Sequence, residues 1–138
     1  MIWQLWSRNR QDQAQGVFSH ATALTLHELS DAMPAKLDMT VPPGFQRMAA
    51  TPEGLRRHRA RLTGRDVETI DRVRVTAPLR TLIDVIVEGE LAPELQAQAI
   101  DDALRRGLIR RRQIDDATVS TRARQRINRI LKQASASL

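Results

Sequence analysis

The sequence of 138 residues contains no cysteine and no tyrosine, and only 3% of its residues are aromatic. Without cysteine, the chain cannot form a disulfide, a thiol nucleophile or a cysteine-ligated metal site. The shortage of aromatic rings argues against the stacking platforms that bind single-stranded nucleic acid. No apolar run approaches the roughly 20 residues that span a bilayer, and the first residues lack the pattern of a secretory signal. These absences favour a cytoplasmic protein with no membrane partner.

Positive charge is concentrated at one end of the chain. The formal net charge is +6, but residues 105–132 hold ten arginines and lysines against two aspartates, a net +8, so residues 1–104 carry −2. Such asymmetry is typical of proteins that bind an anionic polymer. We therefore expect double-stranded DNA as a partner, contacted through its phosphates, with a merely solvated helix face as the alternative. The candidate nucleic-acid-binding residues are Arg110, Arg111, Arg112, Arg122, Arg124, Arg126, Arg129 and Lys132.

Strand and helix signals alternate at the beginning of the chain. Clustered apolar residues at 1–7 predict a short strand, and Val17 and Phe18 predict a second one. Ser19 is a favourable N-cap, so a helix is expected over residues 20–29. The alternation over residues 36–41 predicts a half-buried strand with Lys36, Asp38 and Thr40 on its polar face.

Turn signals and periodicity organise the remainder. A basic strand, either at the edge of the sheet or facing solvent, is expected at residues 55–62, followed by a tight hairpin of residues 67–70 and 73–75. Pro78 opens a helix that Gly89 ends, and Arg80 and Asp84 are placed to form an ion pair in it. Further helices are expected at residues 93–106, ended by Gly107, and at residues 120–134, with a short basic piece at residues 110–116 between them.

These elements predict an α+β fold. We expect a small mixed or antiparallel sheet of short strands packed with four to five helices, and an all-helical C-terminal part. A chain of this length is expected to form one domain, residues 1–138. Within it, residues 1–107 would form the core and residues 108–138 a basic helical segment.

The histidines do not form a recognisable metal motif. His20 and His27 are seven residues apart on one helix, which separates them by about 10 Å and prevents them from sharing one ion. Hydrogen bonding of both rings to the backbone or to water is therefore the favoured interpretation. We predict no metal site.

Catalytic signatures are also missing. Ser19 and His20 are neighbours on a helix, and their side chains diverge by about 100°, so they do not form a nucleophile and base pair. Neither of the two lysines, Lys36 and Lys132, stands two positions after a glutamate, so the Glu-x-Lys strand of a common class of nucleases is absent. We predict no catalytic residue, no cofactor and no enzymatic activity.

Five short motifs occur in a defined order along the chain: Ser19-His20 at the start of a helix, Leu26-His27 within it, Thr40–Pro42 in a strand, His58-Arg59 in another strand and Arg80–Asp84 in a later helix. The ordered set resembles the AbiEi family, the antitoxins of bacterial type IV, or abortive-infection, toxin–antitoxin systems. The resemblance covers about residues 3–107. The motif residues to which it assigns a structural role are Ser19, His20, His27, His58, Arg80 and Asp84.

The resemblance implies a non-catalytic regulator. Such antitoxins look like a winged-helix DNA reader followed by an α+β domain; they repress their own operon and counter a nucleotidyltransferase toxin, usually without a stable complex. Fifteen residues precede Gly16, fewer than a winged helix needs, so we expect the second domain without most of the winged helix. The chain would contribute to DNA binding, autoregulation and toxin neutralisation. The alternative is a stand-alone basic module that binds nucleic acid or an acidic protein.

Overall fold

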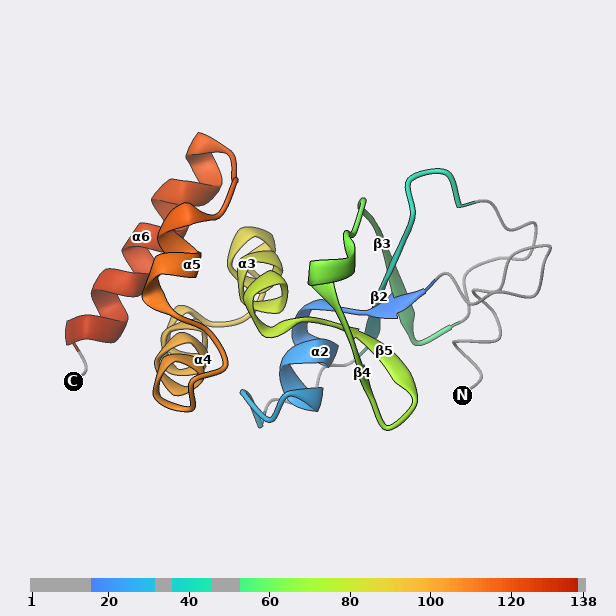
Figure 1. Cartoon of the computed structure of the whole chain (residues 1–138), viewed down its shortest axis with the longest axis horizontal. Helices are drawn as coiled ribbons and strands as arrows, with labels where there is room; N and C mark the ends of the chain where they lie inside the picture. Colours follow the sequence, from blue (N-terminus) through green and yellow to red (C-terminus); the bar gives the residue numbers. More distant parts are fainter. Residues whose placement is uncertain (1–15, 32–35, 46–52, 137–138) are drawn as a thin grey trace.

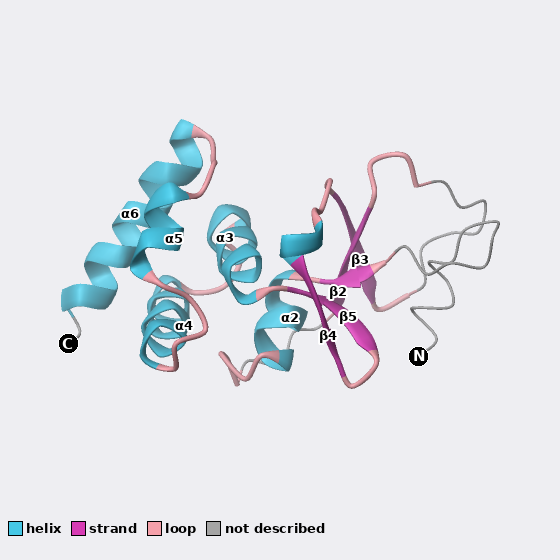
Figure 2. Cartoon of the chain, viewed as in Figure 1, coloured by secondary structure: helices cyan, strands magenta, loops and turns pink. Residues whose placement is uncertain are grey.

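The computed structural model describes residues 16–31, 36–45 and 53–136 (Figure 1). The strand expected at residues 1–7 lies outside these ranges. In chain order, the elements are β1 (Val17–Phe18), α2 (His20–Leu26), β2 (Leu37–Val41), β3 (Leu55–Arg59), η1 (Gly64–Asp66), β4 (Val67–Ile70), β5 (Val73–Thr76), α3 (Pro78–Glu88), α4 (Pro93–Arg105), α5 (Arg111–Asp116) and α6 (Thr121–Ala136). The predicted α+β fold with a helical C-terminal part is confirmed (Figure 2).

The sheet is mixed, with strand order β3-β2-β1-β5-β4. β2 pairs with β3, and β1 with β5, in parallel, whereas β1–β2 and β4–β5 are antiparallel. β3 is an edge strand, as its arginines predict, and both Arg57 and Arg59 are exposed. The expected hairpin turns at Asp71 and Arg72, whose φ angles are 48° and 68°. Two successive residues with positive φ form a two-residue turn that matches the right-handed twist of the flanking strands.

The two faces of the sheet differ in what covers them. One face carries an apolar cluster of Phe18, Met39, Val41, Phe45 and Leu55. The opposite face is covered by α2, which also packs against α3 (Figure 1).

This arrangement corrects the prediction of a half-buried β2. The side chains of Asp38 and Thr40, expected to be on a polar outer face, are only 0% and 2% exposed. They are buried because α2 lies over them, and the Asp38 amide donates a hydrogen bond of 2.7 Å to Thr22 Oγ1 of that helix.

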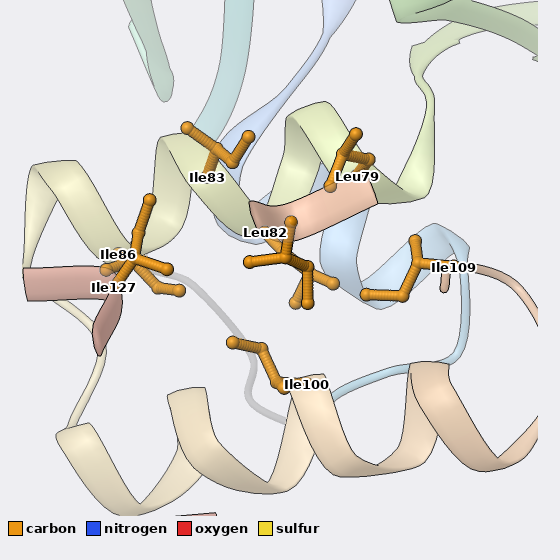
Figure 3. Close-up of a pocket in the computed structure, with 8 residues that line it drawn as sticks. Leu79, Leu82, Ile83, Ile86, Ile100, Ile109 and Ile127 are labelled. Atoms are coloured by element: carbon orange, nitrogen blue, oxygen red, sulfur yellow. The ribbon is translucent and has the colours of Figure 1, made fainter. Parts of the chain in front are cut away.

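Helix α3 connects the sheet to the other helices. It begins at Pro78, after Ala77, and ends before Gly89, whose φ of 78° is the left-handed conformation that glycine adopts without strain. One apolar side packs toward α4 and α6, where the main hydrophobic core forms. Figure 3 shows the residues that close on a small apolar space in this core: Leu79, Leu82, Ile83, Ile86, Ile100, Ile109 and Ile127.

Several element boundaries differ from the prediction. α2 ends at Leu26 rather than at residue 29, because the chain turns at Glu28, whose φ is 59°. The basic piece at residues 110–116 is mostly the short helix α5, and α6 extends to Ala136. No helix in the described part of the chain has both the length and the apolar character that a membrane crossing requires.

Candidate functional site

Three of the predicted DNA-contacting residues form an exposed stripe on α6. Arg122, Arg129 and Lys132 are spaced seven and three residues apart, which places them on one side of the helix. The stripe spans about 15 Å along the axis. No acidic residue occurs in α6, and these three side chains form no ion pair with any residue that the structure describes. Opposite the stripe, α6 buries Ala123, Ile127, Ile130 and Leu131.

Two other arginines of α6 face the protein. Arg124 donates hydrogen bonds to the carbonyl oxygens of Ile114, at 2.9 Å, and Ala117, at 2.7 Å, and so binds the C-terminal end of α5. Arg126 donates to the carbonyl oxygen of Val87 in α3. Both guanidinium groups therefore hold helices together and are not part of the exposed stripe.

The remaining candidates lie at the start of α5. Arg110, Arg111 and Arg112 are all exposed. Arg111 pairs with Asp115 at 3.3 Å and Arg112 with Asp116 at 3.5 Å. Such exposed pairs contribute at most about 1 kcal/mol and break readily, but they cancel charge locally. The stripe on α6 is therefore the more strongly positive surface.

The motif residues near the sheet converge on one polar cluster. His58 of β3 lies beside Thr40 of β2, and Arg56 lies beside Asp38, because the two strands pair in parallel register. Paired residues project from the same face of a sheet. This is the face that α2 covers, and it receives His20 from the first position of that helix.

Asp38 is the centre of this cluster. Its Oδ1 accepts hydrogen bonds from His58 Nε2 and from Arg56 Nε, each at 2.9 Å. Its Oδ2 is buried and has no partner among the described residues. Burial opposes ionisation, but the hydrogen bond from His58 and the charge of Arg56 outweigh it, so the pKa of Asp38 is lowered.

The hydroxyl of Ser19 does not cap α2, which corrects the predicted role of this residue. No side-chain cap hydrogen bond is present. Thr40 Oγ1 instead donates to Ser19 Oγ at 2.7 Å, and Ser19 Oγ contacts Nδ1 of His20 at 2.8 Å. Because Ser19 Oγ accepts this hydrogen bond from the buried hydroxyl of Thr40, it is oriented toward the sheet and not toward the helix amides.

His20 stacks on His58. The ring centroids are 3.7 Å apart and the planes differ by 16°. Burial, followed by the proximity of His58, lowers the pKa of His20 to about 4, so the ring is neutral near pH 7. The backbone of His20 has φ 54°, in the left-handed region that non-glycine residues rarely adopt.

Glu88 completes the cluster from the last position of α3. Its Oε2 lies 3.9 Å from His20 Nε2 and 3.7 Å from His58 Nε2. Burial and the nearby charge of Asp38 raise the pKa of Glu88. One potential ligand atom from each of His20, His58 and Glu88 lies within 4.8 Å of the other two. These are the side chains of the described residues that could hold a metal ion.

The other motif residues lie elsewhere. His27 Nε2 hydrogen bonds to the carbonyl oxygen of Thr76 at 2.7 Å, so it anchors α2 to β5, as expected of a structural histidine. The predicted pair between Arg80 and Asp84 is present at 3.0 Å. Burial raises the pKa of Asp84, and Arg80 opposes that rise.

Sequence reasoning considered His20 with His27 and missed Asp38, Arg56 and Glu88. No local pattern links these residues, because they come from separate strands and from the end of a helix. The sequence does hold one signal for Asp38, its position beside the Thr40–Pro42 motif, but the alternation of polar and apolar residues predicted a solvent-exposed side chain.

No protein-family model and no curated protein matches the chain.

Proposed function

We propose that this chain is a non-catalytic regulatory domain of the antitoxin type that contacts the phosphates of duplex DNA through α6. The observation that carries the proposal is the exposed stripe of Arg122, Arg129 and Lys132, on a helix without acidic residues. Cations that are not neutralised by protein carboxylates are available to displace counterions from DNA. The ordered motifs that resemble AbiEi antitoxins support the regulatory role. A protein with this role would act in the cytoplasm, where bacterial operator DNA lies.

Contacts of this type position a protein on DNA without selecting a sequence. The proposed contribution of this chain is therefore affinity, and operator selection belongs to a separate DNA reader.

The direct test is duplex binding by the full chain, measured by fluorescence anisotropy at several salt concentrations. Three phosphate contacts predict a slope of log affinity against log salt of about −2.7, or a loss of about 40-fold between 50 and 200 mM salt. The triple variant Arg122→Gln, Arg129→Gln, Lys132→Gln should abolish most of this binding and flatten the slope.

The matched control removes the same charge elsewhere. Arg57, Arg65 and Arg72 are exposed, and their triple replacement by glutamine lowers the net charge by the same three units. It should leave affinity within about twofold of the original. Absence of binding at low salt, or equal losses in both triple variants, would contradict the DNA contact through α6.

The antitoxin role has its own test. The chain is co-expressed with a nucleotidyltransferase toxin encoded beside it, and growth is compared with that of cells expressing the toxin alone. Restored growth is expected, and it should survive the Gln substitutions in α6 if neutralisation does not use DNA. Continued growth arrest despite soluble expression would count against the antitoxin role.

A further inference from the structure

We propose that His20, His58 and Glu88 form a binding site for one divalent transition-metal ion of the zinc class. The three residues come from the start of α2, the edge strand β3 and the end of α3, and one ligand atom of each lies within 4.8 Å of the others. Two imidazoles and a carboxylate form a common zinc ligand set. The inference does not depend on DNA binding by α6.

Each of these two histidines has one nitrogen held by the protein and one nitrogen with no hydrogen bond to any described residue. In His58, Nε2 bonds to Asp38 and leaves Nδ1. In His20, Nδ1 contacts Ser19 Oγ and leaves Nε2. Metal-bound histidines almost always use their second nitrogen in this way, to donate to a carboxylate or another oxygen. The arrangement fixes which nitrogen of each ring is available to an ion.

The oxygens behind the two rings are themselves fixed. Asp38 is fully buried and is also held by Arg56. Ser19 is fully buried and accepts a hydrogen bond from Thr40. A ligand sphere supported by a second layer of hydrogen bonds is what distinguishes a built metal site from a chance approach of side chains.

The local charge favours a cation. Asp38, Glu88 and Glu90 carry three negative charges against the single guanidinium of Arg56, which pairs with both Asp38 and Glu90. Arg80 and Asp84, which precede Glu88 in α3, form an ion pair with each other. The second oxygen of Asp38 has no hydrogen-bond partner in the described ranges of the chain. Counted over these three carboxylates and Arg56, the net charge is −2, which a divalent ion balances.

Side-chain adjustment is needed to form the site. Ligand atoms around a tetrahedral zinc ion with bonds of 2.0–2.1 Å lie about 3.3 Å apart, whereas Glu88 Oε2 lies 3.9 Å from Nε2 of His20. The 3.7 Å contact of Glu88 Oε2 with His58 is to Nε2, the nitrogen bonded to Asp38, so the His58 ring must also shift to bring Nδ1 to the ion. An ion lies in the plane of each imidazole that binds it, so the stacked rings must turn away from their 16° angle. Binding of the ion is therefore coupled to opening of the histidine stack.

Three protein ligands leave a fourth position for water or an external ligand, which is the pattern of zinc sites that stay open. The side chains of His20, His58 and Glu88 are 11%, 20% and 19% exposed. The three side chains are therefore partly accessible to an ion from solvent.

The first experiment uses the unmodified full chain without an affinity tag. Zn²⁺ is titrated while the imidazole signals are recorded by ¹H–¹⁵N correlation NMR. The chain has three histidines, so His27, whose ring bonds to Thr76, is an internal control. We expect saturation at one Zn²⁺ per chain with shifts of His20 and His58 only. Mg²⁺ should cause no shift, because it prefers oxygen ligands.

The second experiment measures Zn²⁺ affinity of variants by calorimetry. Glu88→Gln keeps the shape of the side chain and removes the ligand charge, and we expect at least a 100-fold loss. Asp38→Asn removes the negative charge of the acceptor behind His58, and a loss of 10-fold to 100-fold is expected. The matched control is Glu68→Gln, which removes an exposed carboxylate on β4, at the opposite edge of the sheet from β3, and should change affinity by no more than twofold.

Three results would overturn the metal site. The first is absence of Zn²⁺ binding at micromolar concentrations of the metal. The second is a shift of His27 equal to those of His20 and His58, and the third is an equal loss of affinity in Glu88→Gln and Glu68→Gln. The NMR titration needs no variant, so it tests Zn²⁺ binding by His20 and His58 even if Glu88→Gln does not fold.

Discussion

At the scale of single residues, the backbone of His20 is the least expected feature. β1 ends at Phe18, and the amide of Ser19 still donates to the carbonyl oxygen of Asp38 in the sheet, at 3.1 Å. The carbonyl oxygen of Ser19 already accepts the first helical hydrogen bond, from Ala23. The chain must change from strand to helix within one residue, and His20 takes the left-handed φ of 54°.

This conformation costs about 1–2 kcal/mol for a residue with a Cβ atom. Backbone strain of this kind is retained mainly at functional positions. It directs the imidazole of His20 onto His58 and toward Glu88. The strain therefore supports a functional use of this side chain, independently of the ligand geometry.

Comparison of His20→Gly with His20→Ala tests the strain. Both variants remove the imidazole, but glycine adopts a positive φ without a steric penalty. We expect His20→Gly to be about 1 kcal/mol more stable than His20→Ala, measured by urea unfolding with a chelator present. At ordinary helix positions glycine is the less stable of the two, so the reverse order would show that the left-handed backbone is absent in solution.

At the scale of elements, α6 combines two kinds of arginine. Arg124 and Arg126 bind carbonyl oxygens at the ends of α5 and α3, whereas Arg122 and Arg129 face solvent. A cation at a helix C-terminus also interacts favourably with the helix dipole. Inward-facing arginines explain how the six-residue α5 is held, since it has few apolar contacts of its own beyond Ile114.

The prediction for α6 compares two arginines on the same helix. Arg124→Met removes two hydrogen bonds from a charged donor, and we expect the unfolding free energy to fall by about 1.5–3 kcal/mol. Arg122→Met removes an exposed side chain and should change stability by less than about 0.5 kcal/mol. Both are measured by thermal or urea unfolding. Equal effects of the two substitutions would refute the inward role of Arg124.

At the scale of the whole molecule, the helical core unites segments that are far apart in the sequence. Its buried members include Leu24 of α2, Leu82 and Ile86 of α3, Ile100 of α4 and Ile127 of α6. The sheet has a separate apolar cluster on its other face. Because α2 covers the sheet and also contributes to the helical core, disturbance of α6 is transmitted to the sheet side of the molecule.

The corresponding test is Ile127→Ala, a substitution of a side chain that is 1% exposed. Loss of a buried isoleucine side chain of this kind typically costs about 2–5 kcal/mol. Hydrogen exchange should become faster at amides of α2 and α3 as well as α6, because these helices share one core. Faster exchange confined to α6 would show that the C-terminal helices form a separate cooperative unit.

Features governed by neighbours within a few residues were accessible from the sequence. Pro78 and Gly89 bound α3, Asp71-Arg72 turns the hairpin, and the Arg80–Asp84 pair forms as expected. These depend on backbone preferences and on the helical repeat, which act locally. The candidate site was less accessible, because alternation assigned Asp38 to solvent and spacing along one helix compared His20 only with His27.

The sequence by itself determined the α+β composition and the segregation of positive charge into residues 105–132, since both follow from residue order. The tertiary structure alone decided that Asp38 and Thr40 are buried and that His20, His58 and Glu88 meet. It also decided which arginines of α6 face solvent. The physical reason is that parallel pairing of β2 with β3, and packing of α2 across them, join segments whose separation along the chain carries no periodic signal.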